Sequence, residues 1–217
     1  MVASRPELFT LAAGAGAVLA FPGAAAERLD FTRPMTLGPF YPVRKPLEQD
    51  ADLTRLSGHV RRAKGELLEL VGRVLDRDGR PVSGAKLELW QANAAGRYAH
   101  HGDHNTAPLD PDFQGYGVQT TGGDGGYRFV TIKPGFYPAG AYMRAAHLHF
   151  AVDGSYERLV TQMYFQNDRW LAQDRTLAHD LDHRAAGFPG SIFGRPLPGA
   201  VEPGARRMGF DIVLRDG

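Results

Sequence analysis

The segment "LLELVGRVLDRDGRPVSGAKLELWQA", residues 67–92, holds two mostly apolar runs separated by a polar turn. Residues 67–75 and 85–91 have the composition and alternation that are typical of strands. Between them, residues 76–81 supply the Asp, Gly and Pro that favour a reversal of the chain. The segment therefore predicts a strand, a turn and a second strand.

The same arrangement of short apolar runs between Gly, Pro and Asp recurs from about residue 32 to the end of the chain. Further strands are predicted within residues 127–132, 145–154, 159–168 and 207–217. Only residues 168–185 have a composition able to form a helix. Several short strands separated by turns predict an all-β domain: an antiparallel β-sandwich core with long loops and little helix.

The composition narrows the classes of function. The chain has 217 residues, enough to bury one core, and its 25 basic and 24 acidic residues give a net charge of +1. A balanced charge provides no broad field for nucleic acid or an anionic membrane, so neither is expected as a partner. Because the chain has no cysteine, disulfides and cysteine nucleophiles are excluded, and a metal site would need nitrogen and oxygen ligands.

The first thirty residues differ from the rest. Residues 8–21 are apolar and rich in Leu, Ala and Gly, and the "GAAAE" that follows offers a small-residue cleavage site. This layout is typical of a signal peptide, and the span is too short for a transmembrane helix. We predict a signal peptide or disordered leader at 1–30 and one domain at 31–217. A functional signal peptide would export the protein to the periplasm or outside the cell. If the leader does not function as a signal, the protein would stay in the cytoplasm.

The motif "RAAHLHFAV", residues 144–152, places His147 and His149 one residue apart in a predicted strand. Residues two apart in a strand share a face, so both imidazoles would point one way while Leu148 and Phe150 pack into the sandwich. Two exposed histidines on a solvated face would fit this spacing. Metal ligation would fit it too, since imidazole is the commonest metal ligand in proteins.

Two tyrosines stand in glycine-bearing loops elsewhere in the chain. Tyr98 lies in "NAAGRYAHHGDH" and Tyr137 in "KPGFYPAG", each after a predicted strand. Either one alone is an ordinary turn tyrosine. The other histidines near Tyr98 have mixed loop spacing and the aspartates of this region favour turns, so we expect none of them to bind a metal: His100, His101, His104, Asp103, Asp110 and Asp112.

Several longer segments of the sequence match one protein family, in the same order along the chain. They are "TLGPFYP", "GRVLDRDGRPVSGAKLELWQANAAGRYAH", "LDPDFQGYG", "YRFVTIKPGFYP", "RAAHLHF" and "TQMYF". In these segments the chain resembles the intradiol ring-cleavage dioxygenases, non-haem iron(III) enzymes that open catechols. It resembles the protocatechuate-type members more than the catechol-type members.

The resemblance implies a set of functional residues and partners. One Fe(III) would be bound by Tyr98, Tyr137, His147 and His149. Residues with a part in catalysis would be Arg144, Tyr137 and Gln162, and the substrate cavity would be lined by Gly38, Pro39, Phe40 and Trp90. The implied partners are a small catechol and O2, and the product is a cis,cis-muconate-type dicarboxylate. A mixed nitrogen and oxygen ligand set suits iron.

One stretch departs from the family. Protocatechuate-type members usually carry an aromatic and a basic residue just after the second tyrosine's proline, where this chain has Ala139 and Gly140. The resemblance therefore leaves the substituent on the catechol open. The sequence does not fix the oligomeric state, and a homo-oligomer is compatible with it.

Two other classes of protein share parts of the pattern. A cupin also has an H-x-H metal strand, but it needs a glutamate about four residues later, and residues 150–156 contain none. A non-catalytic transthyretin-like β-sandwich binding module shares the strand and turn pattern of residues 72–90. Such a module would have no reason to combine two tyrosines with the H-x-H motif and Arg144.

Overall fold

The computed structural model describes residues 28–181 and 190–216. The strands are β1 (Leu67–Leu75), β2 (Lys86–Trp90), β3 (Tyr116–Thr120), β4 (Gly126–Ile132), β5 (Tyr137–Ala139), β6 (Tyr142–Arg144), β7 (His147–Asp153), β8 (Arg158–Tyr164), β9 (Arg195–Leu197), β10 (Arg206–Gly209) and β11 (Ile212–Val213). The helical elements are η1 (Leu171–Gln173), α1 (Arg175–Asp180) and η2 (Gly190–Ile192). The predicted leader lies almost wholly outside the described residues and stays a prediction.

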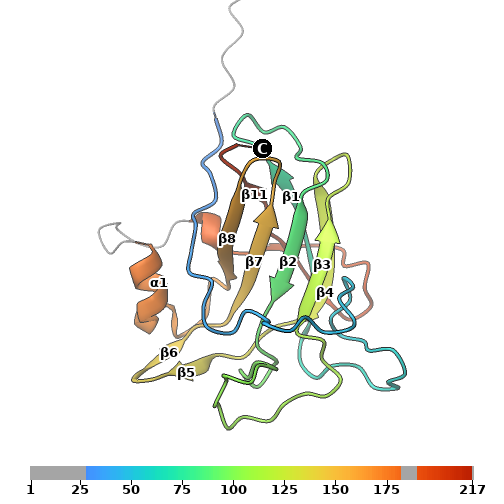
Figure 1. The fold of residues 1–217 in the computed structure, drawn as a ribbon, viewed down its shortest axis with the longest axis vertical. Helices are drawn as coiled ribbons and strands as arrows, with labels where there is room; N and C mark the ends of the chain where they lie inside the picture. Colours follow the sequence, from blue (N-terminus) through green and yellow to red (C-terminus); the bar gives the residue numbers. More distant parts are fainter. Residues whose placement is uncertain (1–27, 182–189, 217) are drawn as a thin grey trace, which may run out of the picture.

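Two sheets form the sandwich. Figure 1 shows the antiparallel sheet with its strands side by side in the order β8, β7, β2, β3. In the second sheet, β1 pairs with β4 on one side and with β10 and β11 on the other, and β9 flanks β10. A hairpin of β5 and β6 lies beyond one end of the first sheet (Figure 1). The predicted all-β sandwich with little helix is confirmed.

The second sheet differs from the expected antiparallel pattern in one respect, because β1 runs parallel to β10 and β11. Parallel neighbours require a long crossover connection. Here the chain completes the other sheet and the helical region before it returns to β1. The single strand expected near the C-terminus is also two short strands, β10 and β11, separated by Phe210 and Asp211.

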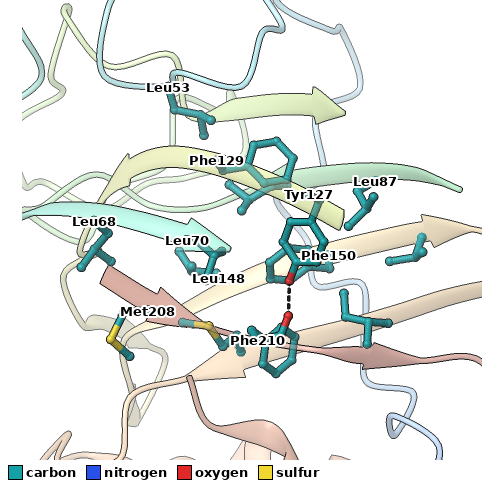
Figure 2. Packing of buried hydrophobic residues seen from close by; sticks show 14 of the residues in the cluster. Leu53, Leu68, Leu70, Leu87, Tyr127, Phe129, Leu148, Phe150, Met208 and Phe210 are labelled. Atoms are coloured by element: carbon teal, nitrogen blue, oxygen red, sulfur yellow. Dashed lines mark hydrogen bonds between the residues drawn. The ribbon is translucent and has the colours of Figure 1, made fainter. Parts of the chain in front are cut away.

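Gly72 of β1 lets the backbone at Phe210 approach β1 closely. A Cβ at residue 72 would lie 1.9 Å from the carbonyl oxygen of Phe210, so no other residue type fits there without a backbone shift. The same carbonyl accepts a hydrogen bond from the hydroxyl of Tyr127 in β4 (Figure 2). The close approach therefore links β1 and β4 to the segment between β10 and β11.

The core lies between the two sheets and is built from alternate residues of their strands. Figure 2 shows its central members, Leu68, Leu70, Leu87, Tyr127, Phe129, Leu148, Phe150, Met208 and Phe210. In β7 the core takes Leu148 and Phe150, so His147 and His149 lie on the opposite face, as the alternation predicted. That face is buried as well, with both histidines 2% exposed. The interpretation of two solvated histidines is therefore wrong.

In the predicted helix-forming region, residues 168–185, helical structure begins at Leu171. It contains η1 and the six-residue α1, and the side chain of Asp174 caps α1 by accepting a hydrogen bond from the backbone of Leu177. Residues 182–189 lie outside the described part of the chain. Within residues 28–181 and 190–216, no helix has the length and apolar character needed to cross a membrane.

Candidate metal centre

The four predicted ligands come from three parts of the chain that meet at one end of the antiparallel sheet. His147 and His149 lie at the start of β7, beside the end of β2. Tyr137 is the first residue of β5, and Tyr98 lies in the long loop that joins β2 to β3. In Figure 1 the start of β7, the end of β2 and the β5–β6 hairpin lie at the same end of the molecule.

The structure brings these four side chains together. The Nε2 atoms of His147 and His149 are 3.2 Å apart, and the Tyr137 hydroxyl is 3.5 Å from Nε2 of His147. The Tyr98 ring stands perpendicular to the Tyr137 ring, with 5.5 Å between the centroids. The Tyr98 hydroxyl is buried and has no hydrogen-bond partner among the described residues. Each of the four side chains is at most 6% exposed.

Both imidazoles are held neutral. Burial lowers the pKa of His147 well below 6.5, and the nearby Arg144 and His149 lower it further. Burial and Arg144 lower the pKa of His149 in the same way. The Nδ1 atom of His147 lies 2.6 Å from the carbonyl oxygen of Ala145, which can only accept, so Nδ1 carries the proton. Nε2 of His147 therefore presents a lone pair to the centre.

The two tyrosines would not ionise by themselves at neutral pH. Burial raises the pKa of Tyr98 well above 10, and its neighbour Tyr137 raises it further. Burial also raises the pKa of Tyr137, against the opposing effect of Arg144. A phenolate at this point requires a cation between the side chains.

The donor set fits a metal ion. Donor atoms that bind one ion at about 2 Å lie roughly 3 to 3.5 Å from one another, and the two donor separations given above agree with this range. Two phenol oxygens and two imidazole nitrogens suit iron, and the chain has no thiolate to favour another metal. No group of three or more His, Asp and Glu side chains gathers among the described residues, so the tyrosines are needed to complete the set.

A cavity of about 580 Å³ opens beside Tyr137 and Arg144. Gly38, Pro39 and Phe40, which the family resemblance assigns to the substrate cavity, line it. The Phe40 ring also packs on the Tyr98 ring, with 4.7 Å between the centroids. Gly38 has a φ of +73°, and a Cβ there would lie 3.2 Å from the His149 ring. Glycine at this position lets the segment pass directly over a predicted ligand.

Trp90 and Gln162 lie behind the predicted ligands and do not line this cavity. Trp90 stacks on the His149 ring with 4.8 Å between centroids and 10° between planes, and it lines a separate cavity of about 260 Å³. Gln162 is fully buried, and its side-chain amide donates to the carbonyl of Thr36. Trp90 thus contacts a predicted ligand and Gln162 contacts Arg144, and the roles that the resemblance implies for the two residues stay predictions.

Arg144 belongs to a buried hydrogen-bond network. It is 3% exposed, its Nε donates to Asp174 at 3.0 Å, and its Nη2 donates to Gln162 and to Tyr164 at 2.9 Å each. Its Nη1 lies 3.5 Å from the Tyr137 hydroxyl. This burial excludes the interpretation of Arg144 as an exposed arginine in a surface ion pair.

Two members of this network were not predicted from the sequence. Tyr164 stands two residues after Gln162 in β8 and shares its face, so the period of the strand could have indicated it. Asp174 stands in the helical region with no spacing signal that connects it to Arg144.

A family model described as "Dioxygenase" matches residues 36–215, which include every predicted ligand and Arg144. The chain belongs to the intradiol dioxygenase family.

The chain is similar to proteins whose names state an activity. The protocatechuate 3,4-dioxygenase beta chain of Burkholderia cepacia is 50% identical over 130 residues, covering 58% of this chain and 55% of the relative. The 6-chlorohydroxyquinol 1,2-dioxygenase of Cupriavidus pinatubonensis is 37% identical over 199 residues, covering 84% of this chain and 64% of the relative. The chain thus spans 55% and 64% of the length of these two relatives.

The fold of this chain also matches solved structures. The dioxygenase domain of a dioxygenase and carbohydrate-binding protein fusion from Streptomyces sp. SirexAA-E superimposes with a TM-score of 0.64 at 26% identity, covering 87% of this chain and all of that domain. Membership of the family leaves the cupin and the transthyretin-like binding module without support.

Glu88 anchors residues 41–45 beside Trp90. Its buried carboxylate accepts hydrogen bonds from Tyr41, from Lys45 at 3.1 Å and from Lys86 at 2.9 Å. The Tyr41 ring in turn stands edge-on against Trp90, with 5.0 Å between the centroids. Glu88 therefore supports the residue that stacks on His149.

We expect the charge on Glu88 to make stability depend on pH. Burial alone would raise the pKa of Glu88, but the hydrogen bonds from Tyr41, Lys86 and Lys45 outweigh it and lower the pKa from 4.5 to about 2. Because the folded-state pKa lies below the unfolded value, the stabilisation is complete above about pH 4.5 and is lost as the pH falls toward 2. The thermal midpoints of the wild type and Glu88→Gln should therefore converge on acidification. A gap that stays constant with pH would contradict a role for this charge.

Proposed function

We propose that this chain is an Fe(III)-dependent intradiol dioxygenase that uses O2 to open a catechol between its two hydroxylated carbons, giving a cis,cis-muconate-type dicarboxylate. The observation that carries the proposal is the meeting of two phenols and two neutral imidazoles at one buried point. The cavity that ends at Tyr137 and Arg144 supports it, since it brings a small molecule to that point. Family membership supports the class of reaction.

Tyr98, Tyr137, His147 and His149 would hold the iron. When bound, ferric iron supplies the Lewis acidity that ionises the phenols and the catechol and makes the ring reactive toward O2. His147 keeps its Nε2 lone pair available because Nδ1 donates to the backbone at Ala145. Trp90 fixes the plane of the His149 ring by stacking on it.

Tyr137 and Arg144 would handle protons and charge. Tyr137 lines the cavity, so its phenolate oxygen can accept the second hydroxyl proton of an entering catechol. Arg144 places Nη1 3.5 Å from that oxygen, where it can stabilise negative charge that develops on the ring. Since Asp174, Gln162 and Tyr164 already hold the guanidinium, it does not have to reorganise during the reaction.

We infer that the catechol carries a substituent. The cavity of about 580 Å³ extends along Pro138, Ala139 and Gly140 to Tyr142 and Thr176. The small residues at 139 and 140 leave this wall open, and a Cβ at Gly140 would meet no atom within 4 Å. The wall is where the aromatic and basic residues usual in protocatechuate-type members would stand.

The iron-loaded protein should be burgundy, because charge transfer from tyrosinate to iron(III) absorbs visible light. It should also consume oxygen with at least one of catechol, protocatechuate, hydroxyquinol and the methyl- and chlorocatechols, and the zinc-loaded protein should be colourless and inactive. Absorption spectra, iron content and oxygen uptake check this. Colourless protein with stoichiometric iron would contradict the two-tyrosinate site, and coloured protein inactive on the whole panel would contradict the reaction.

A further inference from the structure

We propose that Asp174 is a positioning residue: it holds the Arg144 guanidinium so that the Nη1 edge is the part left to face Tyr137 and the cavity. The proposal rests on the proposed function, because it concerns the residue expected to stabilise charge on the ring. Nothing in the sequence connects the two residues, which stand 30 positions apart.

Three hydrogen bonds hold the carboxylate of Asp174 in position. One carboxylate oxygen accepts from Nε of Arg144 and from the backbone of Ala145, each at 3.0 Å. The other accepts from the backbone of Leu177 at 3.0 Å and caps α1. The residue is 1% exposed. A carboxylate held at three points has little freedom to move, so it can fix the partner that it binds.

Because the guanidinium is planar, its contact with Asp174 helps to determine which edge of the group faces the cavity. Arg has five N–H donors in one planar fork. Asp174 takes the Nε donor, and Gln162 and Tyr164 take the two donors of Nη2. Because the group is planar, fixing Nε and Nη2 also fixes Nη1. Only Nη1 then remains to act on the cavity, where it approaches the Tyr137 hydroxyl.

Asp174 differs from the other two acceptors in its charge. Among the described residues it is the only acid that pairs with Arg144, whereas Gln162 and Tyr164 are neutral. Removing one member of a buried ion pair leaves the other charge without a partner, which favours a rearrangement of that group. Loss of the Asp174 charge should therefore let the guanidinium turn away from its present position.

The chain offers a matched control in Asp168. Its carboxylate also accepts from a backbone N–H beside the ligand strand, that of Ala146 at 3.1 Å, and from the backbone of Trp170 at 2.9 Å. It has no contact with Arg144 among the interactions of the described residues. Asp168→Asn thus makes the same chemical change at a similar anchor and leaves the guanidinium alone.

The test compares Asp174→Asn, Asp174→Glu and Asp168→Asn in the iron-loaded protein, using the catechol of the panel that is cleaved fastest. Asp174→Asn should lower kcat by about tenfold to a hundredfold, the scale expected for misplacing a catalytic group, while iron content and colour stay as in the wild type. Asp174→Glu keeps the negative charge on a longer side chain, so its kcat should fall less than that of Asp174→Asn. It also provides a second variant for the test if Asp174→Asn does not fold. Asp168→Asn should keep the wild-type kcat.

A double-mutant cycle separates positioning from general loss of structure. If Asp174 acts through Arg144, adding Asp174→Asn to Arg144→Ala should cause no further fall in kcat. An additive fall, or equal losses in Asp174→Asn and Asp168→Asn, would overturn the proposal.

Crystal structures of the three variants give a readout that does not depend on activity. Asp174→Asn, or Asp174→Glu if the first does not fold, should show the Arg144 guanidinium displaced from Tyr137, and Asp168→Asn should not. An unmoved guanidinium would overturn the proposal. A wild-type protein inactive on every catechol, with a displaced guanidinium in the variant, would contradict the proposed function and leave the positioning role intact.

Discussion

Replacing Tyr98 with phenylalanine should remove most of the iron from the purified protein, together with its colour. The Tyr98 hydroxyl is buried beside Tyr137, so its loss removes one of the four donor atoms proposed for the iron. Phenylalanine fills the same space against Phe40 and Tyr137, so the fold should survive. Since loss of an outer partner alone costs about 10- to 100-fold in metal affinity, loss of a ligand should cost at least that much. Iron per chain and the visible spectrum measure it.

Tyr137→Phe and Tyr142→Phe provide the comparison. Tyr137→Phe should keep more iron than Tyr98→Phe but turn over slowly, because the lost hydroxyl is both ligand and base. Tyr142 also lines the cavity, but its hydroxyl pairs with Thr176 at 2.6 Å, so Tyr142→Phe should keep its iron and colour. Identical iron content and rates in the Tyr98 and Tyr137 variants would show that the two tyrosines do not have separate roles.

Arg144→Ala should leave the ferric site and its colour in place while it lowers turnover by about a hundredfold, the effect of deleting one preorganised charge-stabilising donor. The guanidinium is buried and points Nη1 toward Tyr137, so its loss removes positive charge from the reacting centre. Lysine should restore only part of the rate, because it keeps the charge and loses the planar fork. Single-turnover kinetics of the substrate-loaded variant with oxygen measure the chemical step directly.

Arg195→Ala is the control for this substitution. Arg195 pairs with Asp211 at 2.6 Å with its side chain 61% exposed, and a surface ion pair of this kind contributes little to stability. The Arg195→Ala variant should turn over as the wild type does. A wild-type single-turnover rate in Arg144→Ala would remove Arg144 from the mechanism.

The sequence predicted the elements that depend on local alternation. Residues 67–75 form β1 with the predicted bounds, because the run and its turn are both encoded locally. The direction of pairing was not predictable in this way, since a strand has the same alternation whether its neighbour is parallel or antiparallel. The parallel pairing of β1 with β10 therefore became visible only in the fold.

The candidate site shows the same limit. Alternation placed His147 and His149 on one face, and the family resemblance supplied Tyr98 and Tyr137, but their meeting depends on how the hairpin and the long loop fold over the sheet. Asp174 could not be predicted, because its contact with Arg144 exists only when α1 packs beside β6.

The wall of the cavity and the strand that carries the histidines belong to different parts of the chain. Apart from the predicted ligand Tyr137, residues 38–40 and 138–142 form much of the wall, whereas β7 presents Leu148 and Phe150 to the core on its other face. A substitution in β7 would therefore disturb folding and chemistry together, while a substitution in the wall affects mainly the shape that a substrate meets. Over evolutionary time, or in directed evolution, such a scaffold can exchange one aromatic compound for another by varying its loops and leave the reactive centre unaltered.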